Sequence, residues 1–150
     1  MPAGVDIIVR SFDSTEVKLV VETKLTVQNL KAAEEQLKSS MLHLSCPVGL
    51  IITPQKMWVY ADRFTSTDGT SIQAAGEFAI SHLLRYKPAG SERATEEGRR
   101  FENIVQQWLE ALPRTATREY VGDRRLWEAL SKHVLPAIET GEVRAAAPRL

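Results

Sequence analysis

The sequence predicts a mixed α/β (α+β) fold, in which the first half forms a small mixed β-sheet and the second half is helical. Two β-branched runs separated by a short polar stretch predict a β-hairpin at residues 5–24. Apolar residues at helical spacing follow, and two further apolar runs come after them. The order strand, strand, helix, strand, strand therefore precedes the helices of the second half.

The hairpin strands are expected at residues 5–12 and 16–24, on either side of the polar turn 13–15. Side chains alternate across a strand, so the odd-numbered positions of both strands share one apolar face. These positions are Val5, Ile7, Val9, Val17, Leu19 and Val21. A slip of one residue would turn one apolar set toward water, so this match of faces fixes the parity of the register.

A helix follows, for which Thr26 is a suitable N-cap. Its apolar stripe, placed to pack on the sheet, consists of Leu30, Ala33, Leu37, Met41 and Leu44. Residues 48–52 then predict a buried strand, 54–56 a turn, and 57–60 a strand that returns beside it. Residues 1–64 are therefore expected to form the core of the fold.

The second half is expected to be helical after a loop at residues 65–71. Three stretches keep a helical register: residues 72–86, residues 101–112 closed by Pro113, and a helix that begins at Asp123 and extends to Val134. Residues 65–150 would thus form a helical C-terminal extension that packs on the core within one compact domain.

The composition is that of one folded domain, with 150 residues, 43% of them apolar and 25% charged. Nineteen basic residues balance nineteen acidic ones, so no net charge draws the chain to nucleic acid or lipid, and any nucleic-acid contact must be local. The single cysteine, Cys46, cannot form an internal disulfide, and the sequence shows neither a signal peptide nor a long apolar segment. We therefore expect a cytoplasmic protein that does not enter a membrane.

The polar face of the hairpin carries the candidate site, because Asp6, Glu22 and Lys24 lie opposite the apolar face. With a three-residue turn, Asp6 is directly opposite Glu22, and their Cβ atoms are about 5 Å apart. Two carboxylates this close repel each other unless protons or a cation intervene, and Mg²⁺ or Mn²⁺ suits such oxygen ligands. Lys24 could hold an attacking water or a phosphoryl oxygen beside the metal. These are the groups that metal-assisted phosphodiester hydrolysis requires.

This pattern resembles the PD-(D/E)XK nuclease superfamily, which has the restriction-endonuclease-like fold. The resemblance covers about residues 4–61 and rests on Val5-Asp6-Ile7-Ile8, a short hairpin, and Leu19-Val20-Val21-Glu22-Thr23-Lys24 followed by a helix and a strand. It implies that Asp6, Glu22 and the backbone carbonyl of Thr23 bind the metal and that Lys24 assists the water. Gln36 resembles a glutamine that many restriction-type members carry on the following helix, with Gln28 as the alternative.

The start of the chain departs from the family pattern. The family core begins with a helix, often with another acidic residue, and a first strand, whereas Met1 stands only five residues before Asp6. A partner chain could complete the sheet, the C-terminal helices could fill the gap, or the domain could be a shortened and inactive descendant.

A second E-x-K tripeptide, Glu16-Val17-Lys18, lies at the hairpin bend. Glu22 is preferred because an apolar strand leads into it and Asp6 lies across from it. The polar face could also be a solvated sheet surface, with Lys24 in an ion pair worth under about 1 kcal/mol.

Other polar and aromatic residues have structural explanations. The three histidines lack the spacing of zinc ligands, Cys46 is expected as a small buried residue, and the tryptophans are expected in the core. The histidines are His43, His82 and His133, and the tryptophans are Trp58, Trp108 and Trp127. Several arginines alternate with acids and favour a solvated face, although in a nuclease they would be the first choice for phosphate contacts. They are Arg99, Arg100, Arg114, Arg118, Arg124 and Arg125.

Two functions follow from these patterns. One is a metal-dependent nuclease or nuclease subunit that acts on nucleic acid, with DNA favoured, as in restriction, defence or repair. The other is a catalytically inactive interaction or assembly module on the same fold. The strand at residues 6–12 would expose unpaired backbone groups unless the C-terminal part covers it, so an open edge would predict a homodimer or a partner chain.

Overall fold

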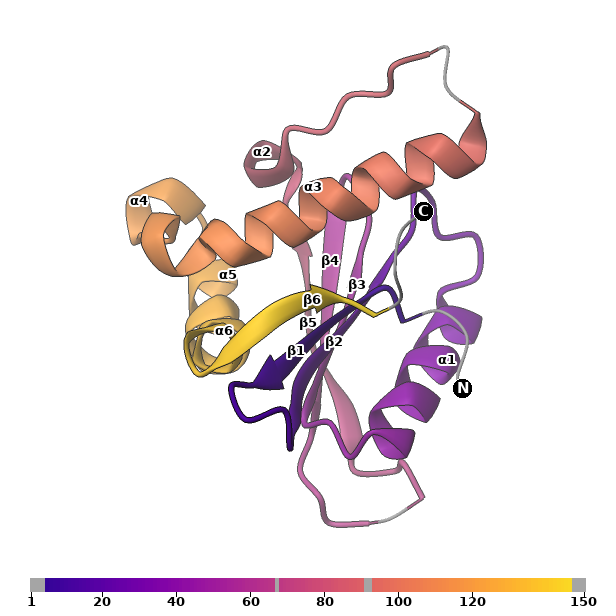
Figure 1. Cartoon of the computed structure of the whole chain (residues 1–150), viewed down its shortest axis with the longest axis vertical. Coiled ribbons are helices and arrows are strands. Elements are labelled where there is room, and N and C mark those ends of the chain that lie inside the picture. Colours follow the sequence, from indigo (N-terminus) through magenta and orange to yellow (C-terminus); the bar gives the residue numbers. More distant parts are fainter. Residues whose placement is uncertain (1–4, 67, 91–92, 147–150) are drawn as a thin grey trace.

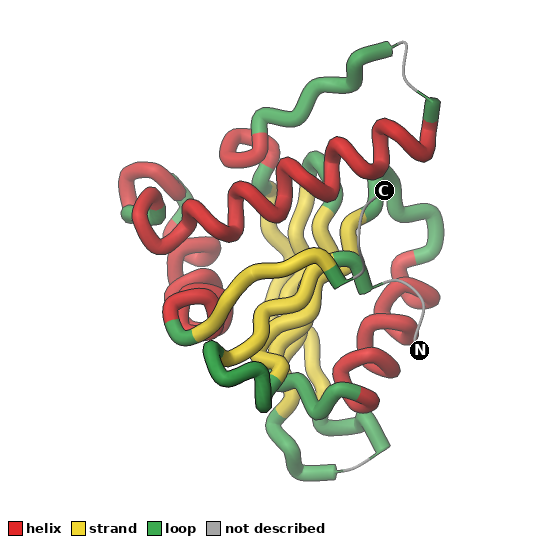
Figure 2. Tube along the Cα trace, viewed as in Figure 1, coloured by secondary structure: helices red, strands yellow, loops and turns green. Residues whose placement is uncertain are grey.

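The computed structural model describes residues 5–66, 68–90 and 93–146 (Figure 1). Six strands of these residues form one sheet in the order β5-β4-β3-β2-β1-β6, with helices on both sides (Figure 2). Strands β2 and β3 are parallel, and the other neighbours are antiparallel. The predicted α+β fold with a mixed sheet is therefore confirmed. The strands are β1 (Ile7–Ser11), β2 (Val17–Thr23), β3 (Val48–Ile52), β4 (Lys56–Asp62), β5 (Ile72–Ala79) and β6 (Gly141–Ala145).

The helices cover the two faces of the sheet unequally. Helix α1 (Leu30–His43) packs alone on one face, which we call the α1 face. The opposite face, which we call the α3 face, is covered by a longer set of helices. This set consists of α3 (Ala94–Thr115), α5 (Arg124–Ala129), the π-helical turn η1 (Leu130–Val134) and α6 (Leu135–Glu139), with the single turns α2 (Ser81–Leu84) and α4 (Arg118–Val121) beside them. No helix in the described ranges is long and apolar enough to cross a bilayer.

The hairpin has the predicted register at its centre, where Ile7 lies opposite Val21 and Val9 lies opposite Leu19. These four side chains pack on the α3 face, whereas Ile8 packs on the α1 face. The predicted alternation is therefore correct from Ile7 to Val9 and from Leu19 to Val21. Val5, predicted on the same face as Ile7, packs instead against the α1-face cluster, because it lies before the start of β1.

The turn end of the hairpin differs from the prediction. The Ser11 N–H donates to the Glu16 carbonyl at 2.9 Å, so the loop has four residues rather than three. A β-bulge at Lys18 shifts the pairing by one residue and compensates for the longer loop. Val17 consequently packs on the α1 face, and its predicted place beside Leu19 is wrong.

Helix α1 begins three residues later than predicted. Its N-cap is Asn29 rather than Thr26, and the Asn29 side-chain oxygen accepts a hydrogen bond from the Ala32 N–H at 3.1 Å. The helix lies close to β3, because a Cβ atom at Gly49 would be only 2.7 Å from the Met41 sulfur. The chain between the end of β2 and Asn29 is therefore a loop, and this loop borders the candidate site.

Residues 72–79 form strand β5, so most of the helix predicted at residues 72–86 is wrong, and within that range the single turn α2 at residues 81–84 is helical. The helical spacing there depended on Ala75 and Ala79, which are exposed in the strand, and only Ile72 and Phe78 are buried. Strand β5 pairs with β4 along its whole length. Backbone pairing at the sheet edge thus outweighs the local helix propensity of the alanines.

The other two predicted helices are confirmed. Helix α3 contains the expected apolar residues, but it begins earlier, at Ala94, and continues two residues past Pro113, so the predicted end at Pro113 is wrong. Asp123 caps α5, because its side-chain oxygen accepts a hydrogen bond from the Leu126 N–H at 2.9 Å. The helix then passes through η1 into α6, which contains Pro136.

Strand β6 has no sequence pattern that predicted it, yet it pairs with β1 over all five residues of both strands. The chain enters β6 at Gly141, where a Cβ atom would lie 2.5 Å from the Arg10 carbonyl oxygen, so only glycine fits this approach. The backbone groups of β1 are paired on both sides as a result. The C-terminal part of the chain therefore completes the sheet at β1, and no partner chain is needed at that edge.

Candidate active site

Asp6 and Glu22 lie at the end of the sheet where β1 begins and β2 ends. The Asp6 N–H donates to the Val21 carbonyl at 2.9 Å, and the Lys24 N–H donates to the Ile52 carbonyl of β3 at 2.9 Å. These bonds continue the sheet by one residue beyond β1 and β2. Because side chains alternate along β2, Glu22 belongs to the α1 face, as Val20 does. Asp6 precedes β1, and its place on the same face stays a prediction.

The Asp6 carboxylate is held by the strand beside it. One of its oxygens accepts hydrogen bonds from the Thr23 N–H at 2.7 Å and from the Thr23 hydroxyl at 3.1 Å. Burial raises the pKa of Asp6 to about 6, and a hydrogen bond and like charge from Glu102 add to this rise, while the bonds from Thr23 oppose it. Asp6 therefore has a fixed orientation and keeps a proton more readily than an exposed aspartate.

Glu22 is fully buried, and neither of its carboxylate oxygens has a hydrogen-bond partner among the described residues. Its neighbour across the parallel pair is the apolar Ile51. Burial raises the pKa of Glu22 to about 7, the charge of Lys24 opposes this rise, and the charge of Asp6 adds to it. An unpaired buried carboxylate costs about 1–3 kcal/mol or more. A proton or a cation at this position would remove that cost.

Lys24 and Gln36 line one pocket of about 360 Å³ between the β2–α1 loop and the first turns of α1. Gln28, the alternative to Gln36, lines the same pocket. The structure thus brings both glutamines close to the lysine, and it leaves the choice between them open. The remaining lining residues are Thr26, Val27, Asn29, Ala32 and Ala33.

Glu102 of α3 is a site residue that sequence reasoning missed. The N-terminal half of α3 reaches past the sheet toward the end where β2 leads into α1 (Figure 1). From there Glu102 forms the hydrogen bond to Asp6 that helps to raise the pKa of Asp6. No local sequence pattern marks Glu102. Its role depends on the packing of α3 near Asp6, a residue that comes much earlier in the sequence.

A divalent cation at this site would have few protein ligands. Within the described ranges, no three side chains of His, Cys, Asp or Glu gather closely enough to hold a metal ion. Asp6 and Glu22 would supply two carboxylates, and water and substrate oxygens would supply the other ligands, as is usual for Mg²⁺. The predicted contribution of the Thr23 carbonyl stays a prediction.

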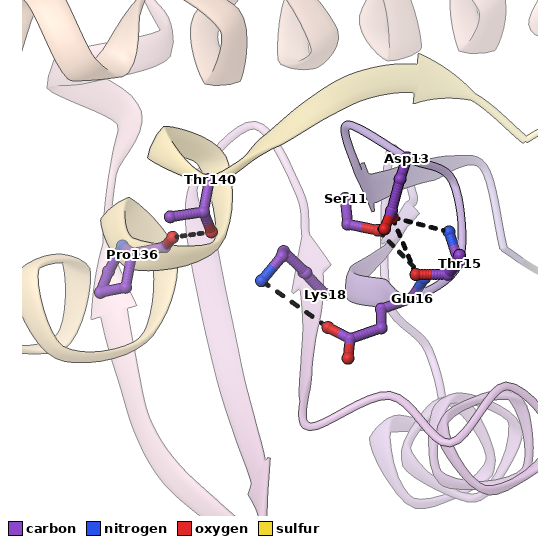
Figure 3. A network of polar contacts seen from close by, with 7 residues as sticks. All are labelled: Ser11, Asp13, Thr15, Glu16, Lys18, Pro136 and Thr140. Atoms are coloured by element: carbon purple, nitrogen blue, oxygen red, sulfur yellow. Dashed lines mark hydrogen bonds and ion pairs between the residues drawn. The ribbon is translucent and has the colours of Figure 1, made fainter.

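The second E-x-K tripeptide lies at the opposite end of β2, next to the hairpin turn (Figure 3). Lys18 and Glu16 form an ion pair at 3.9 Å, in which 72% of the Glu16 side chain is exposed. Around the turn, the Asp13 carboxylate accepts hydrogen bonds from the Ser11 hydroxyl at 2.7 Å and the Thr15 hydroxyl at 2.8 Å. The preference for Glu22 agrees with this geometry, because Glu16 is solvated and far along the strand from Asp6.

The other residues considered from the sequence have surroundings that fit a structural role. Cys46 is buried, which raises the pKa of its thiol to about 12 and makes it unreactive. A ring nitrogen of His82 is 2.8 Å from the Val121 carbonyl oxygen. Burial and the neighbouring Lys132 lower the pKa of His133. Of the tryptophans, Trp108 is buried as predicted, whereas Trp58 and Trp127 are half-buried.

Comparison with known proteins adds no assignment to these observations. No model of a protein family matches the chain, and no match is found among the curated proteins or the solved structures. The function must therefore be inferred from the site itself.

Proposed function

We propose that this protein is a metal-dependent phosphodiesterase that cleaves nucleic acid, with DNA as the favoured substrate. The observation that carries the proposal is the buried carboxylate of Glu22, which has no hydrogen-bond partner in the described chain and lies near Asp6 and Lys24. A buried charge that lacks a partner is costly in a purely structural role. It is useful where a cation and a phosphate must bind.

In this proposal, Asp6 and Glu22 hold one Mg²⁺ or Mn²⁺ ion, which when bound lowers the pKa of a water and neutralises charge on the scissile phosphate. The bonds from Thr23 fix the orientation of Asp6, which also forms a hydrogen bond with Glu102 that a bound cation would replace. Lys24 donates to the attacking water or to a phosphoryl oxygen, and its ammonium group stabilises the negative charge that develops there. Gln36 or Gln28 would orient the substrate from the adjoining pocket.

We also propose that the sheet is a rearranged version of the restriction-endonuclease-like core. That core begins with a helix and a strand, and here α6 and β6 supply such a unit from the C-terminal part of the chain, with β6 beside β1. The family's first helix often carries an acidic residue, and here an acid reaches Asp6 from a different helix, because Glu102 lies in α3 and not in α6. The order β6-β1-β2-β3 and the helix α1 between parallel β2 and β3 support this correspondence.

A cytoplasmic location belongs to the same proposal. Cys46 is a free buried thiol, and such a thiol persists in a reducing compartment.

The proposal is tested by incubating the purified protein with single-stranded and duplex oligonucleotides in Mg²⁺, in Mn²⁺ and in a chelator. Cleavage is expected with either metal and not with the chelator. Glu22→Gln and Asp6→Asn, purified in parallel, should each abolish it, which excludes a contaminating nuclease, whereas Glu16→Gln should retain cleavage. Metal-independent binding without any cleavage would favour the inactive interaction module instead.

A further inference from the structure

A second pocket opens on the α1 face, at the end of α1 that is farthest from Glu22. Its volume is about 620 Å³, and three basic side chains from three separate elements line it together with the acidic Glu16. They are Arg10 of β1, Lys18 of β2 and His43 of the last turn of α1. The exposed ring of Phe64 lines the same pocket. None of these residues belongs to the site at Asp6 and Glu22.

The strands direct two of these cations into the pocket. Strand β1 pairs with β6 without interruption, so the Arg10 side chain points to the same face as Ile8. The bulge at Lys18 interrupts the alternation of β2, and bulges commonly re-aim a side chain in this way. The bulge that corrects the hairpin register thus also places a second cation beside Arg10.

The positive charges of the pocket are weakly neutralised. Among the residues that the structure describes, Arg10 has no ion-pair partner, and Lys18 has only the exposed Glu16 at 3.9 Å. The nearby Glu142 is already bound to Arg144 at 2.7 Å. In a chain with no net charge, this is a local concentration of available cations.

Phe64 adds an aromatic surface that the fold does not require for its core. Its side chain is 58% exposed. Its backbone has a left-handed φ of 56°, which a non-glycine residue adopts only at an energetic cost. The Phe64 N–H donates to an Asp62 carboxylate oxygen at 2.8 Å, which holds this conformation. An exposed flat ring next to cations is the combination that stacks an unpaired base and contacts its phosphate.

We propose that this pocket binds a nucleotide unit of a single-stranded nucleic acid, with the phosphate at Arg10 and Lys18 and the base stacked on Phe64. The link to catalysis rests on the proposed function, because the same strand would pass Glu22 at the other end of α1. Arg10 follows Asp6 by four residues, which is about 13 Å along β1. That distance corresponds to about four steps at the 3.4 Å rise per nucleotide of a helical strand.

The test uses the Glu22→Gln protein in a chelator, so that binding is measured without cleavage, and a short fluorescent single-stranded oligonucleotide. Arg10→Ala and Lys18→Ala should each reduce the slope of log affinity against log salt by about 0.7, the value for one phosphate contact on a single strand. Phe64→Ala should weaken binding about tenfold, and Phe64→Tyr, which keeps a stacking ring, should restore it. Removing the competing charge with Glu16→Gln should strengthen binding.

The matched control is Lys132→Ala, which removes the same charge from a different basic pocket, beside Arg63 and Arg125 on the α3 face. Binding should be unchanged in this variant. The inference is wrong if Lys132→Ala weakens binding as much as Lys18→Ala does, or if Phe64→Ala binds like the wild type. Because Phe64 and Lys18 are partly exposed, the variants should keep the wild-type melting temperature, which circular dichroism checks.

A small substrate separates this inference from the proposed function. The diester bis(4-nitrophenyl) phosphate is too short to reach from Glu22 to Arg10. Arg10→Ala and Phe64→Ala should therefore hydrolyse it at the wild-type rate in Mn²⁺ while they cleave oligonucleotides more slowly. If all variants hydrolyse the diester and also cleave oligonucleotides at equal rates, the proposed nucleotide-binding pocket is contradicted, whereas the proposed catalytic site is supported.

Discussion

Glu16 and Glu22 each precede a lysine by two residues at the two ends of strand β2, but their surroundings are opposite. Glu16 is exposed at the hairpin turn and forms an ion pair with Lys18 (Figure 3). Glu22 is fully buried beside an apolar strand and has no hydrogen-bond partner among the described residues. The same three-residue pattern thus gives a solvated ion pair at one end of the strand and an unneutralised carboxylate at the other.

The comparison shows that location in the sheet, and not the tripeptide, determines what the acid can do. In water, an exposed pair contributes about 0–1 kcal/mol, and neither charge needs a further partner. In a buried position, the carboxylate must take up a proton or a cation, which is the property that a metal site uses. Asp6 strengthens this difference, because its charge adds to the rise in the pKa of Glu22.

The largest expected difference between the two ends is in catalysis. Lys24→Ala should lower kcat for a small phosphodiester on the order of 10²-fold, because it removes a preorganised charge next to the reacting phosphate. Lys18→Ala, the matched change at the other tripeptide, should leave this kcat unchanged. Metal affinity, measured by calorimetry, should stay close to that of the wild type in both variants. Equal loss of kcat in the two variants would contradict the assignment of Lys24.

Stability in the absence of metal should show the next largest difference. Glu22→Met replaces the buried carboxylate by an apolar side chain of similar length and should raise the free energy of unfolding by about 1–3 kcal/mol above neutral pH. Glu16→Gln should change it by under about 1 kcal/mol. Urea titration in a chelator measures both values. A destabilised Glu22→Met protein would show that the carboxylate has partners that stabilise the fold.

The pH dependence of stability should have opposite signs at the two ends. The pKa of Glu22 rises on folding from 4.5 to about 7, and that of Asp6 rises from 3.8 to about 6. The free energy of unfolding that these protonated groups contribute is fully present below their pKa values in the unfolded chain. It is lost as the pH rises through their pKa values in the folded protein. The melting temperature without metal should therefore fall from about pH 5 to about pH 8. Glu22→Gln should flatten the upper part of this fall, and an unchanged slope in that variant would contradict the burial of Glu22.

At the turn, hydrogen bonds from Ser11 and Thr15 lower the pKa of Asp13 from 3.8 to about 2. Its contribution is therefore present above pH 3.8 and is lost as the pH falls through about 2. Asp13→Asn should remove only this acid-side loss and leave the change between pH 5 and pH 8 as in the wild type.

The local features of the candidate site could be predicted from the sequence. Alternation along the two hairpin strands was sufficient to set the central register, because the β-branched runs leave only one parity that buries both apolar sets. The shared face of Asp6 and Glu22 stays a prediction. The predicted register at Ile7 and Val21 is confirmed. It holds because the bulge at Lys18 cancels the extra loop residue, and no sequence pattern indicated either of them.

The features that complete the site depend on contacts between distant parts of the chain. Strand β6 is short and pairs only with β1, so its residues carry no strong strand pattern of their own. Strand β5 contains alanines that favour a helix until β4 provides backbone partners. Glu102 acquires its role only when α3 packs over the sheet. Each of these outcomes is set by tertiary packing rather than by local propensity.

Metal binding by the two glutamate variants tests the central claim most directly. Titration of the wild type, Glu16→Gln and Glu22→Gln with Mn²⁺, at a pH above 7 so that Glu22 is ionised, compares the two ends of β2 in one experiment. The wild type and Glu16→Gln should bind the ion with equal affinity and melt at a higher temperature in its presence, and Glu22→Gln should lose both effects. Equal binding by Glu22→Gln, or a wild type indifferent to Mn²⁺, would contradict the proposed metal site.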